Sequence, residues 1–190
     1  MSNTIIVGID EAGRGPLAGR VYAASVILDK NSKIQGLNDS KKLSEKRRYS
    51  LYHEIKERSI SFGIGYAEVS EIESLNILQA TFLAMRRSIE KLSVKFDYIL
   101  VDGNIFPFNN EFNGEAIVKG DSKIEEIMAA SILAKVERDI YMDEMSKIYP
   151  QYQFDKHKGY PTKLHREMII KYGVLPIHRK TFCNVKEFCK

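Results

Sequence analysis

The sequence predicts an α/β fold, in which a mixed five-stranded sheet is flanked by helices and followed by a helical C-terminal portion. Short apolar segments alternate with longer amphipathic ones, whereas the later part of the chain is helical in pattern. No repeat, low-complexity stretch or linker divides the 190 residues, and a chain of this length can bury a sizeable core. We therefore expect one domain over residues 1–190, with its helical portion at about 151–190 and an α+β arrangement as the alternative.

Five apolar segments have the length and composition of strands. They are residues 4–9, 21–28, 60–69, 96–101 and 115–118. The second segment is rich in small residues, which indicates burial on both faces. Gly63 and Gly65 make the third segment a short and irregular strand. A loop over residues 105–114, which contains Pro107, separates the last two.

Four segments have the pattern of helices, and each begins at a hydroxyl residue that can cap its first turn. They are residues 44–58, 70–92, 122–149 and 162–172, with Ser44, Ser70, Ser122 and Thr162 as the N-caps. A glutamate three residues after Ser70 and after Ser122 completes a capping box at both positions. A break is expected near Asn76. Few charges lie in the first half of the third helix, which indicates a buried helix.

Composition excludes several classes of protein. No N-terminal stretch has the pattern of a signal peptide, and no apolar run approaches the length of a membrane span. Cys183 and Cys189 are the only cysteines, and their spacing matches no common zinc pattern. We expect a soluble protein of the reducing cytoplasm, without a membrane partner.

The net charge of +4 is weak evidence for a nucleic-acid partner, but the positive charge is clustered. One basic group contains Lys41, Lys42, Lys46, Arg47 and Arg48, and a second contains Lys156, His157, Lys158, Lys163, His165 and Arg166. Either group can be a solvated surface or a set of phosphate contacts, and composition alone does not separate the two.

Carboxylates follow three of the predicted strands. They are Asp10 and Glu11 after the first strand, Asp102 after the fourth and Asp121 after the fifth. Ligand sites in such sheets form where strands end, so these acids can meet at one edge. Neighbouring residues of a regular strand point to opposite faces, so Asp10 and Glu11 both point inward only if the chain leaves strand geometry at Glu11.

Converging carboxylates repel one another and raise one another's pKa unless a cation compensates them. Hard divalent cations prefer such oxygen ligands, and two ions about 4 Å apart suit phosphodiester hydrolysis. Each acid also has a structural alternative. Asp121 can stabilise a helix N-terminus, Asp102 can form a turn with Gly103, and Glu11 can pair with Arg14. The coincidence at three strand ends favours a metal site.

A glycine-rich loop, Gly13-Arg14-Gly15, follows the first two acids. Glycine lets a backbone approach a bulky ligand where a Cβ would clash. The loop matches neither a P-loop nor a dinucleotide fingerprint, and no serine–histidine–acid set is evident in the sequence. Our hypothesis from the residues is that the acids hold metal while the loop holds a nucleic-acid strand.

The motifs occur in an order that resembles a known family, bacterial ribonuclease HII, the type 2 ribonuclease H. They are residues 8–19, 38–44, 101–103, 119–122, 129–139, 149–150, 157–162 and 173–179. The resemblance implies a ribonuclease H-like fold and an endonuclease that hydrolyses the RNA strand of RNA–DNA hybrids. It also implies nicking on the 5′ side of single ribonucleotides in duplex DNA, leaving a 3′-hydroxyl and a 5′-phosphate, and a place in ribonucleotide excision repair.

The resemblance further implies roles for individual residues. The family's four metal-binding acids, which hold two Mg²⁺ or Mn²⁺ ions, correspond to Asp10, Glu11, Asp102 and Asp121. Its loop that senses the ribose 2′-hydroxyl corresponds to Gly13, Arg14 and Gly15, and the tyrosine that stacks on the adjoining deoxyribose corresponds to Tyr160. Lys41 and the second basic group would contact phosphates. For Tyr160 alone, a buried loop aromatic is the alternative.

Two other functions remain open at this point. One is a catalytically silent nucleic-acid-binding protein on the same fold, and the other is a resolvase-like or transposase-like nuclease. Arg20 stands where the family commonly has proline, and the short N-terminus differs from type 3 relatives, which carry a substrate-binding domain there. No sliding-clamp peptide is recognised, and we expect a monomer.

Overall fold

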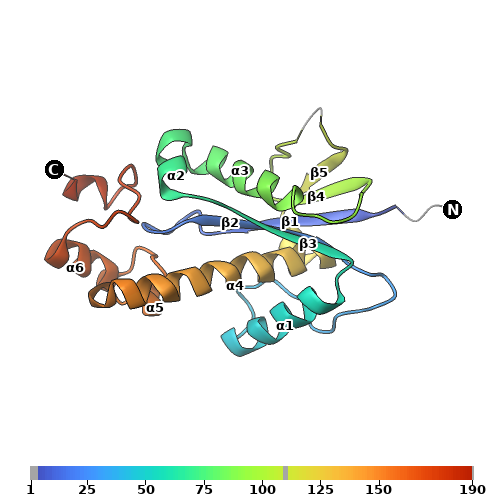
Figure 1. Cartoon of the computed structure of the whole chain (residues 1–190), viewed down its shortest axis with the longest axis horizontal. Helices are drawn as coiled ribbons and strands as arrows, with labels where there is room; N and C mark the ends of the chain where they lie inside the picture. The colour runs from blue at the N-terminus through green and yellow to red at the C-terminus, as the bar shows by residue number, and fades with distance from the viewer. Residues whose placement is uncertain (1–3, 109–110, 190) are drawn as a thin grey trace.

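A mixed five-stranded sheet lies at the centre of the structure, with helices on both of its faces (Figure 1). The computed structural model describes residues 4–108 and 111–189. The strands are β1 (Ile6–Ala12), β2 (Val21–Ile27), β3 (Ser61–Ala67), β4 (Tyr98–Asp102) and β5 (Gly114–Ile117). Their order is β3-β2-β1-β4-β5. β2 pairs antiparallel with both β1 and β3, and β4 and β5 run parallel to β1. This confirms the predicted α/β fold.

The helices form two layers, one on each face of the sheet (Figure 1). They are α1 (Glu45–Arg58), α2 (Val69–Leu75), α3 (Ile77–Ile89), α4 (Glu125–Ile148), α5 (Phe154–His157) and α6 (Lys163–Tyr172). α2 and α3 cover one face, whereas α4 crosses the other and carries α1 on its outer side. α5 packs against the C-terminal part of α4, and α6 and the C-terminal tail lie at the same end of the molecule (Figure 1). Within the described residues, no helix has the length and apolar character needed to cross a membrane.

Two of the predicted N-caps are confirmed. The amide of Arg47 donates to Ser44 Oγ at 3.3 Å, and the amide of His165 donates to Thr162 Oγ1 at 3.2 Å. The break near Asn76 is also confirmed. Asn76 has a φ of 69° and its side chain caps the start of α3. The predicted loop over 105–114 is free of helix and strand up to residue 113 where the structure describes it, residues 109 and 110 lying outside.

Both predicted capping boxes are wrong. α2 begins two residues earlier than predicted, because the amide of Glu68 donates to the side chain of Glu71 at 2.9 Å. α4 begins only at Glu125, after a 3₁₀ turn, η1 (Gly120–Ser122). Ser122 Oγ donates to the carbonyl of Lys119 at 3.0 Å and caps no helix. The chain uses this turn to present backbone amides to the sheet edge.

The predicted irregularity of the third strand is also wrong, since β3 pairs with β2 along its whole length. Gly63 and Gly65 do not distort the strand but allow α3 to pack closely against it. A Cβ at Gly63 would overlap the carbonyl of Ser88, and one at Gly65 would lie 2.6 Å from the amide of Ser88. α3 therefore lies directly on the backbone of β3. The predicted burial of β2 on both faces is confirmed.

β1 continues through the first two acids, whereas the sequence predicts that it ends before them. Asp10, Glu11 and Ala12 remain paired with β2. The parallel pairing with β4 stops at Ile9 and Val101. The first two acids therefore lie on a strand that is still paired with β2, one and two residues beyond its last pair with β4.

The first half of α4 is buried against the sheet, as predicted, and its closest approach is at Gly8 of β1. A Cβ at Gly8 would overlap the backbone of Glu126 and lie 2.5 Å from the amide nitrogen of Ile127. The small residues Ala129, Ala130 and Ser131 of the same helix are buried as well. Close packing at this crossing sets how far α4 lies from the acids of β1.

We predict that Gly8→Ala lowers the free energy of unfolding by about 2 kcal/mol or more, because α4 must move to admit the methyl group. Urea unfolding followed by circular dichroism measures this. Gly15→Ala is the matched control, since its Cβ would meet no atom closer than 4.0 Å and the residue has no positive φ; we expect a change within about 0.5 kcal/mol. Equal stability of both variants would contradict the packing described.

Candidate active site

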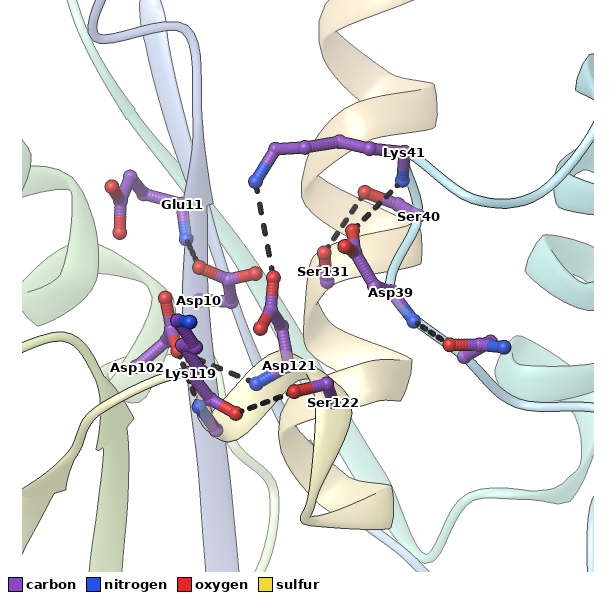
Figure 2. A network of polar contacts seen from close by, with 12 residues as sticks. Asp10, Glu11, Asp39, Ser40, Lys41, Asp102, Lys119, Asp121, Ser122 and Ser131 are labelled. Atoms are coloured by element: carbon purple, nitrogen blue, oxygen red, sulfur yellow. Dashed lines mark hydrogen bonds and ion pairs between the residues drawn. The ribbon is translucent and has the colours of Figure 1, made fainter.

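Three aspartates converge at the end of β1 and β4 (Figure 2). Asp10 lies on β1, Asp102 is the last residue of β4, and Asp121 lies in η1, directly after β5. Each offers one carboxylate oxygen, and these three atoms lie within 4.8 Å of one another. Residues that are far apart in sequence thus meet because the strands are adjacent and parallel, as predicted for this edge of the sheet.

Backbone amides hold the carboxylates in this arrangement. Asp102 Oδ1 accepts hydrogen bonds from the amides of Gly120 at 2.7 Å and Asp121 at 3.3 Å. Asp10 Oδ1 accepts from the amide of Glu11 at 2.7 Å. Lys119 has a φ of 57°, in the left-handed region, which starts the turn that delivers the first two amides. Fixed dipoles of the main chain therefore position charges that would otherwise move apart.

The cluster is electrostatically unfavourable as it stands. Asp10 is buried, and this burial, together with the charges of Glu11 and Asp102, raises its pKa well above the ordinary value. Burial and the charge of Asp102 also raise the pKa of Asp121. Both shifts disfavour the ionised form. The cluster thus has negative charge that its own neighbourhood compensates only in part.

Among the described residues, Lys41 is the cation that forms an ion pair with this cluster. Its Nζ lies 3.8 Å from Asp121 Oδ2, and its side chain is 78% exposed. Burial lowers the pKa of Lys41, but the carboxylates of Asp10, Asp39 and Asp121 outweigh it and raise the pKa overall. A contact this long and this exposed compensates little.

A side-chain contact attaches the loop that carries Lys41 to the helix behind the site (Figure 2). The hydroxyls of Ser40 and Ser131 lie 2.9 Å apart and are buried. The amide of Lys41 donates to Asp39 Oδ1 at 2.9 Å. Lys41 thereby extends its side chain over Asp121 from a fixed base (Figure 2).

These observations fit a divalent metal site. The donor set consists of carboxylate oxygens, which Mg²⁺ and Mn²⁺ prefer. The oxygens are close together, those of Asp10 and Asp102 are held by amides, and the ion pair that the described residues offer them comes from the exposed Lys41, so a bound cation would relieve their repulsion. Asp10, Asp102 and Asp121 are the residues that could hold it.

Glu11 is not part of this convergence. It stays in regular strand geometry, and its side chain points away from Asp10 in Figure 2. Glu11 Oε1 lies 3.5 Å from Nη1 of Arg14. Burial raises the pKa of Glu11, although Arg14 lowers it in part. The structure therefore brings together three of the four acids and pairs the fourth with the glycine loop.

The glycine loop is fixed from behind by Arg179, to which the sequence assigned no role. Its fully buried guanidinium donates to five main-chain carbonyls between residues 13 and 20, at 2.6–3.2 Å. These acceptors are Gly13, Arg14, Pro16, Gly19 and Arg20. Arg179 lies in the last of the ordered motifs, which was the only sequence signal for it. One side chain thus sets the course of the whole loop.

A second buried arginine, Arg138 of α4, lies under the same loop. Gly13 has a φ of 104°, and a Cβ there would lie 2.5 Å from Arg138 Cδ. Arg138 Nη2 donates to the carbonyl of Lys158 at 2.9 Å. The neighbouring Asp139 pairs with Lys135 at 2.5 Å and leaves Arg138 free to contact the loop. Arg138 instead joins the loop to the segment after α5.

Tyr160 lies opposite the glycine loop. Its side chain is 40% exposed, which contradicts the alternative of a buried loop aromatic. A Cβ on Gly15 would lie 4.0 Å from Tyr160 Cε1, and the guanidinium carbon of Arg138 lies 5.5 Å from the ring centroid. The loop and the tyrosine therefore border one surface.

The histidines of the second basic group do not contribute to this surface. His157 and His165 are buried, so the prediction that they contact phosphates is wrong. They face His178 inside the C-terminal portion, where their rings contact one another. In this group, the hypothesis of phosphate binding therefore applies only to the lysines and the arginine.

Comparison with known proteins now identifies the family. The family model described as Ribonuclease HII matches residues 7–185. Ribonuclease HII of Marinomonas sp. (strain MWYL1) is 54% identical over 183 residues, which are 96% of this chain and 92% of that protein. Ribonuclease HII of Vibrio vulnificus (strain YJ016) is 53% identical over 182 residues, which cover 96% and 87%.

A solved structure agrees with these sequence matches. The crystal structure of ribonuclease H2 from Pyrococcus horikoshii OT3 matches with a TM-score of 0.79 and 25% identity, covering 96% of each chain. The fold is therefore the ribonuclease H-like fold expected from the motifs. With matches of this extent at the levels of motif, sequence and structure, this chain belongs to the ribonuclease HII family of endoribonucleases.

Proposed function

We propose that this chain nicks duplex DNA on the 5′ side of single embedded ribonucleotides, as well as hydrolysing the RNA strand of RNA–DNA hybrids. Cleavage would leave a 3′-hydroxyl and a 5′-phosphate. The observation that carries the proposal is that the strand bearing Asp10 leads directly into the glycine loop, which contacts Glu11 at one end and borders Tyr160 at the other. Its setting would be ribonucleotide removal in the cytoplasm.

Asp10, Asp102 and Asp121 would hold the metal, with Glu11 completing the set. The contact of Glu11 with Arg14 is long and partly exposed, so either side chain can turn at little cost. Two bound Mg²⁺ or Mn²⁺ ions would supply an activated water and stabilise the leaving oxygen. The amides of Gly120 and Asp121 keep Asp102 oriented throughout, which avoids reorganisation at the moment of reaction.

Discrimination between RNA and DNA is assigned to the loop and the tyrosine. The 2′-hydroxyl is the group that distinguishes the two at a given position. Gly15 would let the backbone approach it closely, next to the side chain of Arg14, while Gly13 gives the loop its positive φ and its contact with Arg138. The exposed face of Tyr160 would stack on the neighbouring deoxyribose. Lys41, exposed at the edge of the aspartates, would contact a phosphate.

A nicking assay tests the proposal directly. The substrate is a DNA duplex with one embedded ribonucleotide, and an all-DNA duplex of the same sequence is the control. We expect a single nick 5′ of the ribonucleotide with Mg²⁺ or Mn²⁺ and none with EDTA. Binding without cleavage in either metal would favour the silent alternative, and equal cutting of all-DNA junctions would favour the resolvase-like one.

Asp10→Asn should lower cleavage by at least a factor of about 100 while leaving duplex affinity almost unchanged, because a metal ligand is lost without a change in shape. In metal-free buffer the variant should also unfold at a higher temperature than the wild type, since a buried charge is removed. Calorimetry and the nicking assay measure these effects.

Addition of Mg²⁺ should stabilise the wild type but not Asp10→Asn, because only the native wild-type site binds the ion. Asp155→Asn, which removes an exposed carboxylate outside the cluster, is the control and should retain activity and the Mg²⁺ response. An active Asp10→Asn protein would contradict the assigned ligand set.

Arg14→Ala should reduce the preference for ribonucleotide-containing over all-DNA duplex about tenfold, while general affinity changes less. Lys42→Ala is the matched control, since loss of an exposed cation should weaken binding to both duplexes equally. Fluorescence anisotropy and nicking rates on both duplexes measure the two effects. Unchanged selectivity in Arg14→Ala would refute the role of the loop.

A further inference from the structure

Three buried histidines form a cluster behind Tyr160. His157 belongs to α5, His165 to α6 and His178 to the tail, and their side chains lie inside the C-terminal portion. The rings of His157 and His165 stack with centroids 4.4 Å apart, and Nε2 of His165 lies 3.0 Å from Nε2 of His178. The proposed reaction does not use these rings.

The hydrogen bonds of this cluster have a defined direction. The amide of Leu175 lies 2.8 Å from His178 Nδ1 and can only donate, so this nitrogen must accept. At the other end, His165 Nδ1 lies 3.0 Å from the carbonyl oxygen of Tyr160, which can only accept. His178 Nε2 must therefore donate its proton to His165 Nε2.

His157 has its own fixed tautomer. Its Nδ1 accepts from the amide of Gly159 at 3.2 Å, so its Nε2 donates to the carbonyl of Tyr152 at 2.9 Å. All six ring nitrogens are thus satisfied when the three histidines are neutral. A proton added to either ring of the pair of His165 and His178 would place two N–H groups against each other.

Burial favours this neutral state. It is the main reason why the pKa of His165 is lowered to about 4 and that of His178 to about 3; the charge of His157 lowers the pKa of His165 further, and that of His165 lowers the pKa of His178. Burial also lowers the pKa of His157. The cluster therefore remains uncharged at neutral pH and keeps a single arrangement of protons.

The two ends of the cluster reach the two sides of the substrate surface. At one end, His165 holds the main chain of Tyr160, whose amide also donates to the carbonyl of His157 at 2.8 Å. At the other end, His178 precedes Arg179, the residue that fixes the glycine loop. Backbone bonds of 2.8 Å from Gly19 to Ile177 and from Arg179 to Leu17 join the same tail segment to this loop.

We propose that His178 and His165 are positioning residues, which form a directional hydrogen-bond relay that holds Tyr160 at a fixed place opposite the Gly13-Arg14-Gly15 loop. His178 and Arg179 are adjacent and serve opposite sides of one recognition surface. The positioning role rests on the proposed function of Tyr160 as the residue that contacts the deoxyribose next to the ribonucleotide, whereas the relay rests on the hydrogen bonds alone.

The relay itself is tested without activity, by ¹⁵N NMR of the histidine rings in the full-length protein at pH 7. We expect His165 to carry its proton on Nδ1 and His157 and His178 to carry theirs on Nε2. The opposite tautomer at His165, or an imidazolium at His165 or His178, would overturn the relay whatever the enzyme does.

The positioning role is tested by a pair of variants at His165. In His165→Asn the side-chain amide can still donate to Tyr160 from the place of Nδ1, whereas in His165→Gln it reaches the place of Nε2 and leaves Tyr160 without this donor. We expect kcat/KM on the single-ribonucleotide duplex to fall about tenfold in His165→Gln and to stay within about twofold of wild type in His165→Asn.

A uniform RNA–DNA hybrid distinguishes positioning from general damage to the fold. Its sugars next to the cleavage site are riboses, so Tyr160 has no deoxyribose to stack on, and His165→Gln should lose little activity on it. Equal loss on both substrates, or equal behaviour of the two variants, would overturn the positioning role. If instead the wild type fails to nick the single-ribonucleotide duplex, the proposed function falls, and with it the positioning role, while the NMR result still decides the relay.

Discussion

Mutual repulsion of carboxylates at the end of β1 and β4 is the constraint on which the rest of the site depends. Asp10, Asp102 and Asp121 bring three oxygens within 4.8 Å, and Lys41, which pairs with them among the described residues, is exposed and makes a contact of 3.8 Å. The fold holds them by main-chain amides and by the close crossing of α4 over Gly8. Such an arrangement is stable as part of a larger core and becomes favourable when a divalent cation binds. The repulsion thus lowers the stability of the fold at the place where the metal would bind.

The recognition surface obeys a related principle, since its exposed groups are held from beneath by buried polar ones. Arg179 gathers the carbonyls of the glycine loop, and Arg138 lies between Gly13 and Tyr160. The neutral histidines His165 and His178 connect the tyrosine to the same tail segment. A loop of glycines has little conformational preference of its own, so these buried donors supply the order that the loop sequence lacks.

Much of this was predictable because periodicity and motif order depend on local chemistry. The five strands, the caps at Ser44 and Thr162 and the buried α4 follow from such patterns. The capping box at Ser70 was wrong because Glu68 and Glu71 form one two residues earlier. The one at Ser122 was wrong because the chain forms a 3₁₀ turn there, in which the amides of Gly120 and Asp121 donate to Asp102. The orientation of Glu11 depends on pairing with β2, and the burial of His157 and His165 depends on tertiary packing. Neither can be obtained from residue type and spacing alone.

The central claim is that the three converging aspartates are a metal site, and anomalous diffraction from crystals soaked in Mn²⁺ tests it most directly. We predict a strong anomalous peak from Mn²⁺ at bonding distance from carboxylate oxygens of Asp10, Asp102 and Asp121. The peak should be absent from Asp10→Asn crystals soaked in the same way. A soaked wild-type crystal with no peak among these aspartates, or with Mn²⁺ bound only to other acids, would contradict the account.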